Sequence, residues 1–228
     1  MTVQSHIKKC HSCQVNKCNQ LKYGKLPTKL AITNPWEALC VDLIGPYTLK
    51  GKDRTQIDYM CVTMIDPATS WFEIVELPIS QQELDIPTGT KGHKGKDKHI
   101  HPQQSYFDKI SATVGRLVNK TWFSRYPRSQ YIIYDNGSEF KLHFETLCES
   151  YGINHQPTSV RNSQENAILE RVHQTIMAML CTAELDMADT VSESDITDFL
   201  TKVAWAVCST YHTVLKTLPG AAIFGKDM

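Results

Sequence analysis

The chain has 228 residues, and its 24 Lys and Arg balance its 24 Asp and Glu, so the formal net charge is zero. Hydrophobic residues make up 41% and charged residues 21%, an ordinary globular composition with enough apolar material for one sizeable core. This composition excludes a wholly disordered chain, a collagen-like chain and a disulfide mini-protein. Balanced charge also argues against a uniformly basic DNA-coating protein, but it leaves room for a local basic patch. The charges are in fact uneven, because residues 1–30 hold six Lys and no acid, whereas residues 184–198 hold six acids and no Lys or Arg.

The sequence gives no sign of a membrane or secretory protein. The apolar stretch at 203–215 is too short to span a bilayer, and the first residues lack the basic-then-apolar plan of a signal peptide. We therefore expect a soluble intracellular protein with reduced thiols. The eight cysteines agree with this expectation, because most are scattered through apolar segments, where a buried free thiol is the ordinary reading, and the only cluster is Cys10, Cys13 and Cys18.

The first half of the chain reads as a strand-rich region. We expect strands at 36–46, closed by Gly45-Pro46, then at 59–65 and at 71–77, which short polar turns would join into an antiparallel meander. The Gly-, Lys- and His-rich stretch at 80–104 has no hydrophobic period and is interpreted as a flexible surface insertion. The histidines of this stretch are interpreted as part of a solvated loop. The alternative is that they bind a metal ion opportunistically; they are His93, His99 and His101.

The second half alternates between helical and strand patterns. A helix is expected from Ser105, because apolar residues recur there every three to four positions. The last helix is expected to end at Pro219-Gly220. The order of elements predicts a mixed α/β sheet covered by helices. The apolar residues of the first of these helices are Phe107, Ile110, Val114 and Val118, and the later elements are a strand at 131–134, a helix at 140–151, a strand at 153–156 and helices at 166–183 and 195–215.

Three carboxylates occupy unusual places in this pattern. Asp42 interrupts the apolar strand LCVDLI, where a charge is costly unless it is paired or bound to a metal. Asp135 directly follows the strand at 131–134, at the end where α/β folds place ligand-binding groups. Glu170 lies on the helix at 166–183, on a different face from the buried stripe. Taken singly, each has a plain structural reading: a paired strand Asp, an Asp-Asn-Gly turn and a solvated helix Glu.

Together the three carboxylates suggest a metal site. Side chains from three elements could converge on one crevice, and three hard oxygen ligands suit Mg²⁺ or Mn²⁺. Two such ions, about 3.5–4 Å apart, can activate a nucleophile and stabilise a leaving oxygen in phosphoryl transfer. Three other acidic residues lie near the same motifs. We interpret Glu165 as a residue before the helix, Glu139 as part of a helix entry and Asp66 as a turn residue.

The motifs WEALCVDLIGP, YDNGSEF and NAILERVHQT, in this order, resemble the catalytic core of a retroviral or gypsy-type LTR retrotransposon integrase. The resemblance covers about residues 5–225. It implies an α/β, ribonuclease H-like fold with a mixed five-stranded sheet flanked by helices, preceded by a short Cys-containing segment. It also implies that Asp42, Asp135 and Glu170 are the catalytic residues and the ligands of Mg²⁺ or Mn²⁺, in a DNA-binding nucleotidyltransferase of the ribonuclease H-like superfamily.

The resemblance further implies how the chain is divided and what it binds. Residues 1–34 would be a partial zinc-binding segment and linker, and residues 35–228 the catalytic core. The partner would be double-stranded DNA, at element ends and at the target. Lys141, Arg161 and Arg171 lie beside the metal motifs and are expected to contact its phosphates, and solvated surface charges are the alternative. The functional unit would be a homo-oligomer. It would be nuclear when it functions and cytoplasmic before it enters the nucleus, and no membrane would be involved.

The N-terminal cysteines resemble only half of the family's His-His-Cys-Cys zinc module. Cys10 and Cys13 match its Cys pair, but a structural zinc needs four ligands and this chain has no room upstream for the two His. We therefore expect an incomplete zinc site. The alternative is a zinc ion held by His6, Cys10, Cys13 and Cys18.

Two other functions remain open from the sequence. A domesticated or truncated integrase-like domain would bind DNA or protein without chemistry, and the missing His pair favours it, whereas the presence of all three carboxylates disfavours it. A nuclease of the ribonuclease H type would use the same metal chemistry, but the flanking motifs look like integrase. The favoured function is a polynucleotidyl transferase that trims the 3′ ends of element DNA and joins them to target DNA.

Overall fold

A computed structural model of the chain describes residue 10 and residues 34–50, 56–78, 109–158, 167–186 and 193–226. Within this part, five strands form one mixed sheet in the order β3-β2-β1-β4-β5. The first three pair antiparallel, and β1, β4 and β5 pair parallel. The strands are β1 (Ala38–Lys50), β2 (Gln56–Ile65), β3 (Phe72–Glu76), β4 (Tyr131–Tyr134) and β5 (Asn154–Pro157).

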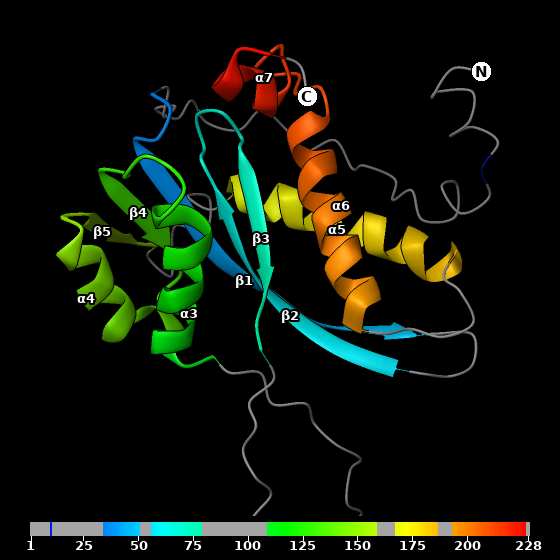
Figure 1. Cartoon of the computed structure of the whole chain (residues 1–228), viewed down its shortest axis with the longest axis horizontal. Helices are drawn as coiled ribbons and strands as arrows, with labels where there is room; N and C mark the ends of the chain where they lie inside the picture. The colour runs from blue at the N-terminus through cyan, green and yellow to red at the C-terminus, as the bar shows by residue number, and fades with distance from the viewer. Residues whose placement is uncertain are drawn as a thin grey trace, which may run out of the picture.

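Helices cover both sides of the sheet. In Figure 1, α3 and α6 lie in front of the strands, and α5 is drawn behind them, where it contacts β1 and β2. In the described residues, no helix is long and apolar enough to cross a membrane. The helical elements are α3 (Ser111–Val118), the π-helical turn η1 (Asn119–Phe123), the 3₁₀ turn η2 (Ser138–Phe140), α4 (His143–Ser150), α5 (Ala167–Asp186), α6 (Glu193–Ser209) and α7 (Pro219–Phe224).

The predicted fold class and order of elements are therefore confirmed, and α7 is an addition to them. Strand β4 has the predicted bounds, and β2, β3, β5 and α5 differ from prediction only at their ends. Among the apolar residues of the helix predicted from Ser105, Val114 and Val118 are fully buried in α3, Ile110 is 63% exposed, and Phe107 lies outside the described residues. Ile110 is exposed because the helix begins only at Ser111, so the helical period does not extend back to it.

The predicted end of the first strand at Gly45-Pro46 is wrong, because β1 continues to Lys50. Ile44 pairs with Cys61 and Tyr47 pairs with Tyr59, so two residues of β1 face one residue of β2. This is a β-bulge, one of the few places where proline fits within a sheet. Gly45 has a φ of 109°, and a Cβ there would lie 3.0 Å from the main-chain oxygen of Tyr59, so glycine lets the chain bulge and then pair again.

The last predicted helix is also shorter than expected. Helix α6 ends at Ser209 instead of 215, and His212 and Thr217 form an isolated antiparallel bridge. Pro219 begins α7 instead of ending the preceding helix. Proline suits this position because the first helical residue needs no N–H donor and its fixed φ is already helical.

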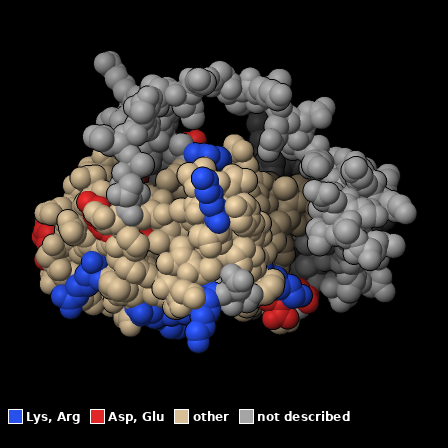
Figure 2. Space-filling view, turned by 90° about the horizontal axis from the view of Figure 1, so that it is seen from above, with Lys and Arg blue, Asp and Glu red and all other residues tan. Residues whose placement is uncertain are grey.

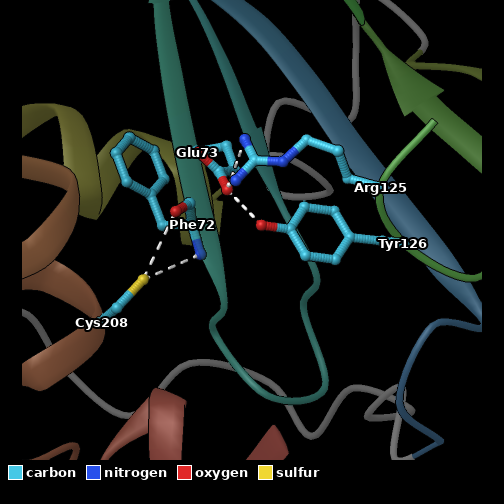
Figure 3. A network of polar contacts seen from close by, with 5 residues as sticks. All are labelled: Phe72, Glu73, Arg125, Tyr126 and Cys208. Carbon is cyan, nitrogen blue, oxygen red and sulfur yellow. Dashed lines mark hydrogen bonds and ion pairs between the residues drawn. The ribbon is translucent and has the colours of Figure 1, made fainter. Parts of the chain in front are cut away.

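Two tethers fix strand β3 at the edge of the sheet (Figure 3). The thiol of Cys208, from α6, accepts a hydrogen bond from the Phe72 amide and donates one to the Phe72 carbonyl oxygen, both at 3.4 Å. On the other side of the strand, the carboxylate of Glu73 accepts a hydrogen bond from the Tyr126 hydroxyl and lies 3.3 Å from the guanidinium of Arg125. Strand β2 lies between β3 and β1, so these contacts stabilise the edge of the same sheet that contains β1.

Candidate functional site

The parallel pairing of β1 with β4 places Asp42 beside Asp135. The register ends with Val41 opposite Tyr134; Asp42 follows within β1, and Asp135 follows directly after β4. Both aspartates thus lie where the parallel ladder ends, at the carboxyl end of β4, a position that α/β folds use for ligands. Each carboxylate accepts a hydrogen bond from the amide that follows it, at 2.8 Å from Leu43 and at 2.7 Å from Asn136.

Glu170 is brought to the same region by α5. It lies in the first turn of this helix, where the positive end of the helix dipole favours an acidic side chain. The helix packs on β1 and β2, with Leu169 and Ile176 buried beneath it. Glu170 itself is exposed, as predicted from its position outside the buried stripe.

The carboxylates act on one another electrostatically. Burial raises the pKa of Asp42 to about 6, the hydrogen bond from Leu43 opposes this rise, and the negative charges of Asp135, Glu139 and Glu170 add to it. Two of these three neighbours are the predicted partners of Asp42. An ionised carboxylate beside three others is destabilised, and a divalent cation with hard oxygen ligands would relieve that repulsion.

Glu139 is a member of this group that the sequence interpretation missed. It lies in the 3₁₀ turn η2, and its charge acts more strongly on Asp42 than that of Glu170. Its carboxylate lies against Gly137, where an added Cβ would come within 2.5 Å of the Oε2 atom. Its position four residues after Asp135 in DNGSE was the available signal, but we interpreted it as a helix entry.

The carboxylates are not gathered into a finished metal site. Within the described residues, no group of three or more His, Cys, Asp or Glu side chains is arranged to hold a metal ion. The donor set nevertheless fits Mg²⁺ or Mn²⁺, because it consists of carboxylate oxygens that repel one another around Asp42. Asp135 and Glu170 are exposed, so their carboxylates have room to turn toward a cation.

A histidine on α5 also reaches Asp42. The Nδ1 atom of His173 lies 4.0 Å from the Oδ2 atom of Asp42, and its Nε2 atom lies 2.8 Å from the hydroxyl of Thr63. Burial lowers the pKa of His173 to about 4, so the ring is neutral at neutral pH. Neither His173 nor Thr63 was among the predicted site residues.

The described cations that were predicted to bind DNA lie beside these motifs. Lys141 directly follows η2 and Arg171 directly follows Glu170, and both are exposed. Arg161 lies outside the described residues. Figure 2 views the molecule from the α7 end, and the described Lys and Arg side chains on that face are dispersed, many along one edge, without merging into a continuous basic surface. DNA contact by these residues stays a prediction.

Several other predictions fall outside the described residues. Cys10 is described and half-buried, but Cys13 is not described, so the incomplete zinc site stays a prediction. The same holds for Glu165, for most of the predicted 1–34 segment and for the predicted insertion at 80–104 with its three histidines. Asp66, by contrast, is a buried turn residue, as we interpreted it. Its carboxylate accepts hydrogen bonds from the Thr69 hydroxyl at 2.6 Å and from the Ala68 amide at 3.2 Å.

Comparison with known proteins places the fold among integrase catalytic cores. No protein-family model and no curated protein matches the sequence. The HTLV-2 integrase catalytic core domain, solved with magnesium in a trimeric form, is similar with a TM-score of 0.53 and 14% identity, over 84% of this chain and 97% of that one. The BIV integrase catalytic core domain is similar with a TM-score of 0.52 and 13% identity, over 83% of this chain and 95% of that one.

A third similar structure is larger than this chain. It is the simian T-cell lymphotropic virus intasome solved in complex with the PP2A regulatory subunit B56 gamma, with a TM-score of 0.56 and 15% identity, over 96% of this chain and 64% of that one. The chain therefore has the ribonuclease H-like fold of retroviral integrase catalytic cores, which confirms the resemblance at the level of the fold.

Proposed function

We propose that the chain is an integrase-like polynucleotidyl transferase that trims the 3′ ends of element DNA and joins them to target DNA. The observation that carries this proposal is that the parallel register of β1 and β4 in an integrase-core fold brings Asp42 and Asp135 to the same end of the ladder, with Glu170 on α5, which packs on β1. Mg²⁺ or Mn²⁺ is the cofactor that this donor set suits, and Asp42, Asp135 and Glu170 would hold it. When bound, such ions activate the attacking oxygen and stabilise the leaving oxygen.

In this proposal the chain's own residues bind and orient the reactants. In the first reaction, a water oxygen forms a bond to a phosphorus near the DNA end, and the bond from that phosphorus to the 3′ oxygen breaks, which frees a 3′-OH. In the second reaction, that 3′-OH attacks a target phosphodiester in line and displaces its 3′ oxygen. No residue forms a covalent bond to DNA at any stage, so the chemistry requires no Ser, Tyr or Cys nucleophile. Lys141, Arg161 and Arg171 would hold the phosphates, and DNA affinity would therefore fall with added salt.

Several wider features belong to the same proposal. Double-stranded DNA is the substrate, the working unit is a homo-oligomer, and the source is an LTR retrotransposon or retrovirus. The protein would act in the nucleus after a cytoplasmic stage. Cys10 and Cys13 would be the ligands of a partial zinc site. The HTLV-2 core, which is trimeric and bound to magnesium, and the simian virus intasome support the oligomer and the cation by analogy of fold.

The test is a joining assay with a pre-cleaved DNA end, a target duplex and Mg²⁺. We expect joined product from the wild type and about a thousandfold less from Asp42→Asn, Asp135→Asn and Glu170→Gln, since the cation's stabilisation of the transition state is worth several kcal/mol. Asp198→Asn is the matched control, because Asp198 is exposed on α6. Full joining by the three variants would contradict the proposal, and cut but unjoined DNA from the wild type would indicate a ribonuclease H-type nuclease.

A second candidate is an integrase-like domain that binds DNA or protein without chemistry. It is favoured by the lack of a finished metal-binding group among the described residues. It predicts that calorimetric titration of the wild type with Mg²⁺ or Mn²⁺ gives no binding isotherm, and that no DNA is cut or joined. Binding of either cation that Asp42→Asn abolishes would favour the transferase.

A further inference from the structure

His173 connects the helix that carries Glu170 to strand β1, which carries Asp42, and to the neighbouring strand β2. Its side chain is 16% exposed, and its two ring nitrogens face two different strands. Nδ1 lies 4.0 Å from Oδ2 of Asp42 on β1, and Nε2 lies 2.8 Å from the hydroxyl oxygen of Thr63 on β2. The ring therefore occupies the space between α5 and both strands.

Thr63 is placed to receive this contact by the register of the sheet. It is the residue of β2 directly opposite Asp42, so the two side chains lie on the same face. The Thr63 side chain is fully buried, and its hydroxyl oxygen lies 3.1 Å from the main-chain oxygen of Asp42. The ring carries its proton on Nε2 when the Thr63 hydroxyl donates to the main-chain oxygen of Asp42, and on Nδ1 when that hydroxyl donates to Nε2; in both cases Thr63 holds the ring and Nδ1 faces Asp42.

Helical spacing connects the same ring to Glu170. His173 follows Glu170 by three residues in α5, and residues so spaced are neighbours on a helix surface. A ring fixed to Thr63 thus fixes the helical turn from which Glu170 projects. Because Nδ1 lies 4.0 Å from Oδ2 of Asp42, the ring limits where that carboxylate can turn.

On the premise of the proposed function, we propose that His173 is a positioning residue. Anchored by Thr63, it restricts the positions from which the Asp42 carboxylate and the Glu170 turn come together on a divalent cation. A residue with only a packing role would contribute to stability but not selectively to cation affinity. Second-sphere contacts of this kind typically change metal affinity or activity by about 10- to 100-fold.

The test measures Mg²⁺ and Mn²⁺ binding to the full chain by calorimetry without DNA, together with thermal stability and joining kinetics. His173→Gln retains an amide near the position of Nε2, which can still reach Thr63, whereas His173→Asn retains one only near Nδ1. Thr63→Val removes the anchor with little change of shape. Thr201→Val is the matched control, because Thr201 is exposed on α6 and its hydroxyl bonds only to its own helix, at Thr197.

We expect His173→Ala, His173→Asn and Thr63→Val to weaken cation affinity by about tenfold or more. The single-turnover joining rate should fall with it, while the KM for DNA stays unchanged. His173→Gln should recover most of the affinity, and the His173→Ala/Thr63→Val double variant should lose no more than either single one. The ring ¹⁵N shifts of His173 should change when Thr63 is replaced, because the Thr63 hydroxyl bonds directly to Nε2.

Two results would overturn the inference while leaving the proposed function intact. One is wild-type cation affinity in His173→Ala. The other is a loss that follows the fall in thermal stability in every variant, with no recovery in His173→Gln. A wild-type protein that neither binds the cations nor joins DNA would instead overturn the proposed function and, with it, this inference.

Discussion

Asp42 and Asp135 occupy matched places in neighbouring parallel strands but have different surroundings. Each directly follows the paired register and accepts the amide of the next residue. Asp42 has β2 on its other side and His173 of α5 near its carboxylate, and its side chain is only 25% exposed. Asp135 is exposed, because its strand ends there and the chain turns into η2. The backbone thus sets where both carboxylates lie, but neighbouring elements decide how deeply each of them is buried.

The largest expected difference between Asp42 and Asp135 is the effect of their substitution on the free energy of unfolding of the metal-free protein. Asp42→Asn removes a carboxylate whose pKa is raised to about 6 by burial and then by neighbouring charges, while the amide oxygen can still accept the Leu43 N–H. We expect it to raise the free energy of unfolding at pH 7 by about 2 kcal/mol. Asp135→Asn should change it by less than about 0.5 kcal/mol, since exposed substitutions usually do.

Urea unfolding in the presence of a chelator measures this difference. Because both variants should lose joining activity by about a thousandfold, only the stability measurement separates the two aspartates. A loss of stability in Asp42→Asn would show that the buried carboxylate is paired favourably, and it would contradict the upward shift of the Asp42 pKa.

The pH dependence of stability offers a second way to test the Asp42 environment. The pKa of Asp42 is raised from 3.8 to about 6, so its contribution to stability is fully present below pH 3.8 and is lost as pH rises through 6. The pKa of His173 is lowered from 6.5 to about 4 by burial, so its contribution is present above pH 6.5 and is lost as pH falls through 4. The two effects oppose each other over the same range.

Single variants should separate these opposing effects. Relative to the wild type, the stability of metal-free Asp42→Asn should rise between pH 4 and 6.5, and that of His173→Gln should fall. Each difference should have a slope of at most about 1.4 kcal/mol per pH unit. Unfolding curves at several pH values measure both, and parallel wild-type and variant profiles would contradict the assigned directions.

Glu139 provides a smaller perturbation of the same environment. Glu139→Gln removes one of the charges that raise the pKa of Asp42, but burial, the larger cause, remains. The pKa of Asp42 should therefore fall from about 6 toward 3.8 without reaching it, as followed by the ¹³C shift of its carboxyl carbon. Glu149→Gln is the control, because Glu149 is exposed on α4 and is not among the groups that raise this pKa. An unchanged Asp42 titration in Glu139→Gln would remove Glu139 from the site.

Local pattern was enough to predict most of the fold. Strand β4 has its predicted bounds, and helix α5 differs from prediction only at its ends. One error lies where a tertiary contact overrides a local signal, and another where a local signal fits two different structures. Gly45-Pro46 resembles a strand end, but the antiparallel partner β2 continues the pairing beyond the bulge. Pro219 resembles a helix end, but it begins another helix.

The site was less predictable than the fold. The strand and helix patterns singled out Asp42, Asp135 and Glu170, and the resemblance gave them catalytic roles, whereas the surroundings of Asp42 depend on register and on helix packing. Thr63 could have been noticed by the criterion applied to Asp42, as a polar residue within the apolar run YMCVTMI. His173 gave no such signal, because a histidine on a helix is informative only once the facing strand is known.

The smallest expected effect comes from the glycine next to Glu139. Gly137 has an ordinary φ of −70°, so alanine is compatible with the backbone there, but its Cβ would lie within 2.6 Å of the Glu139 carboxylate. That carboxylate ends a flexible side chain, so it should move aside at little cost, and Gly137→Ala should change stability by less than about 0.5 kcal/mol. The pKa of Asp42 should still fall, by less than in Glu139→Gln. Gly152→Ala is the opposite control: no atom lies within 4 Å of its Cβ, but φ is +70°, so it should cost about 1 kcal/mol and leave the Asp42 titration unchanged.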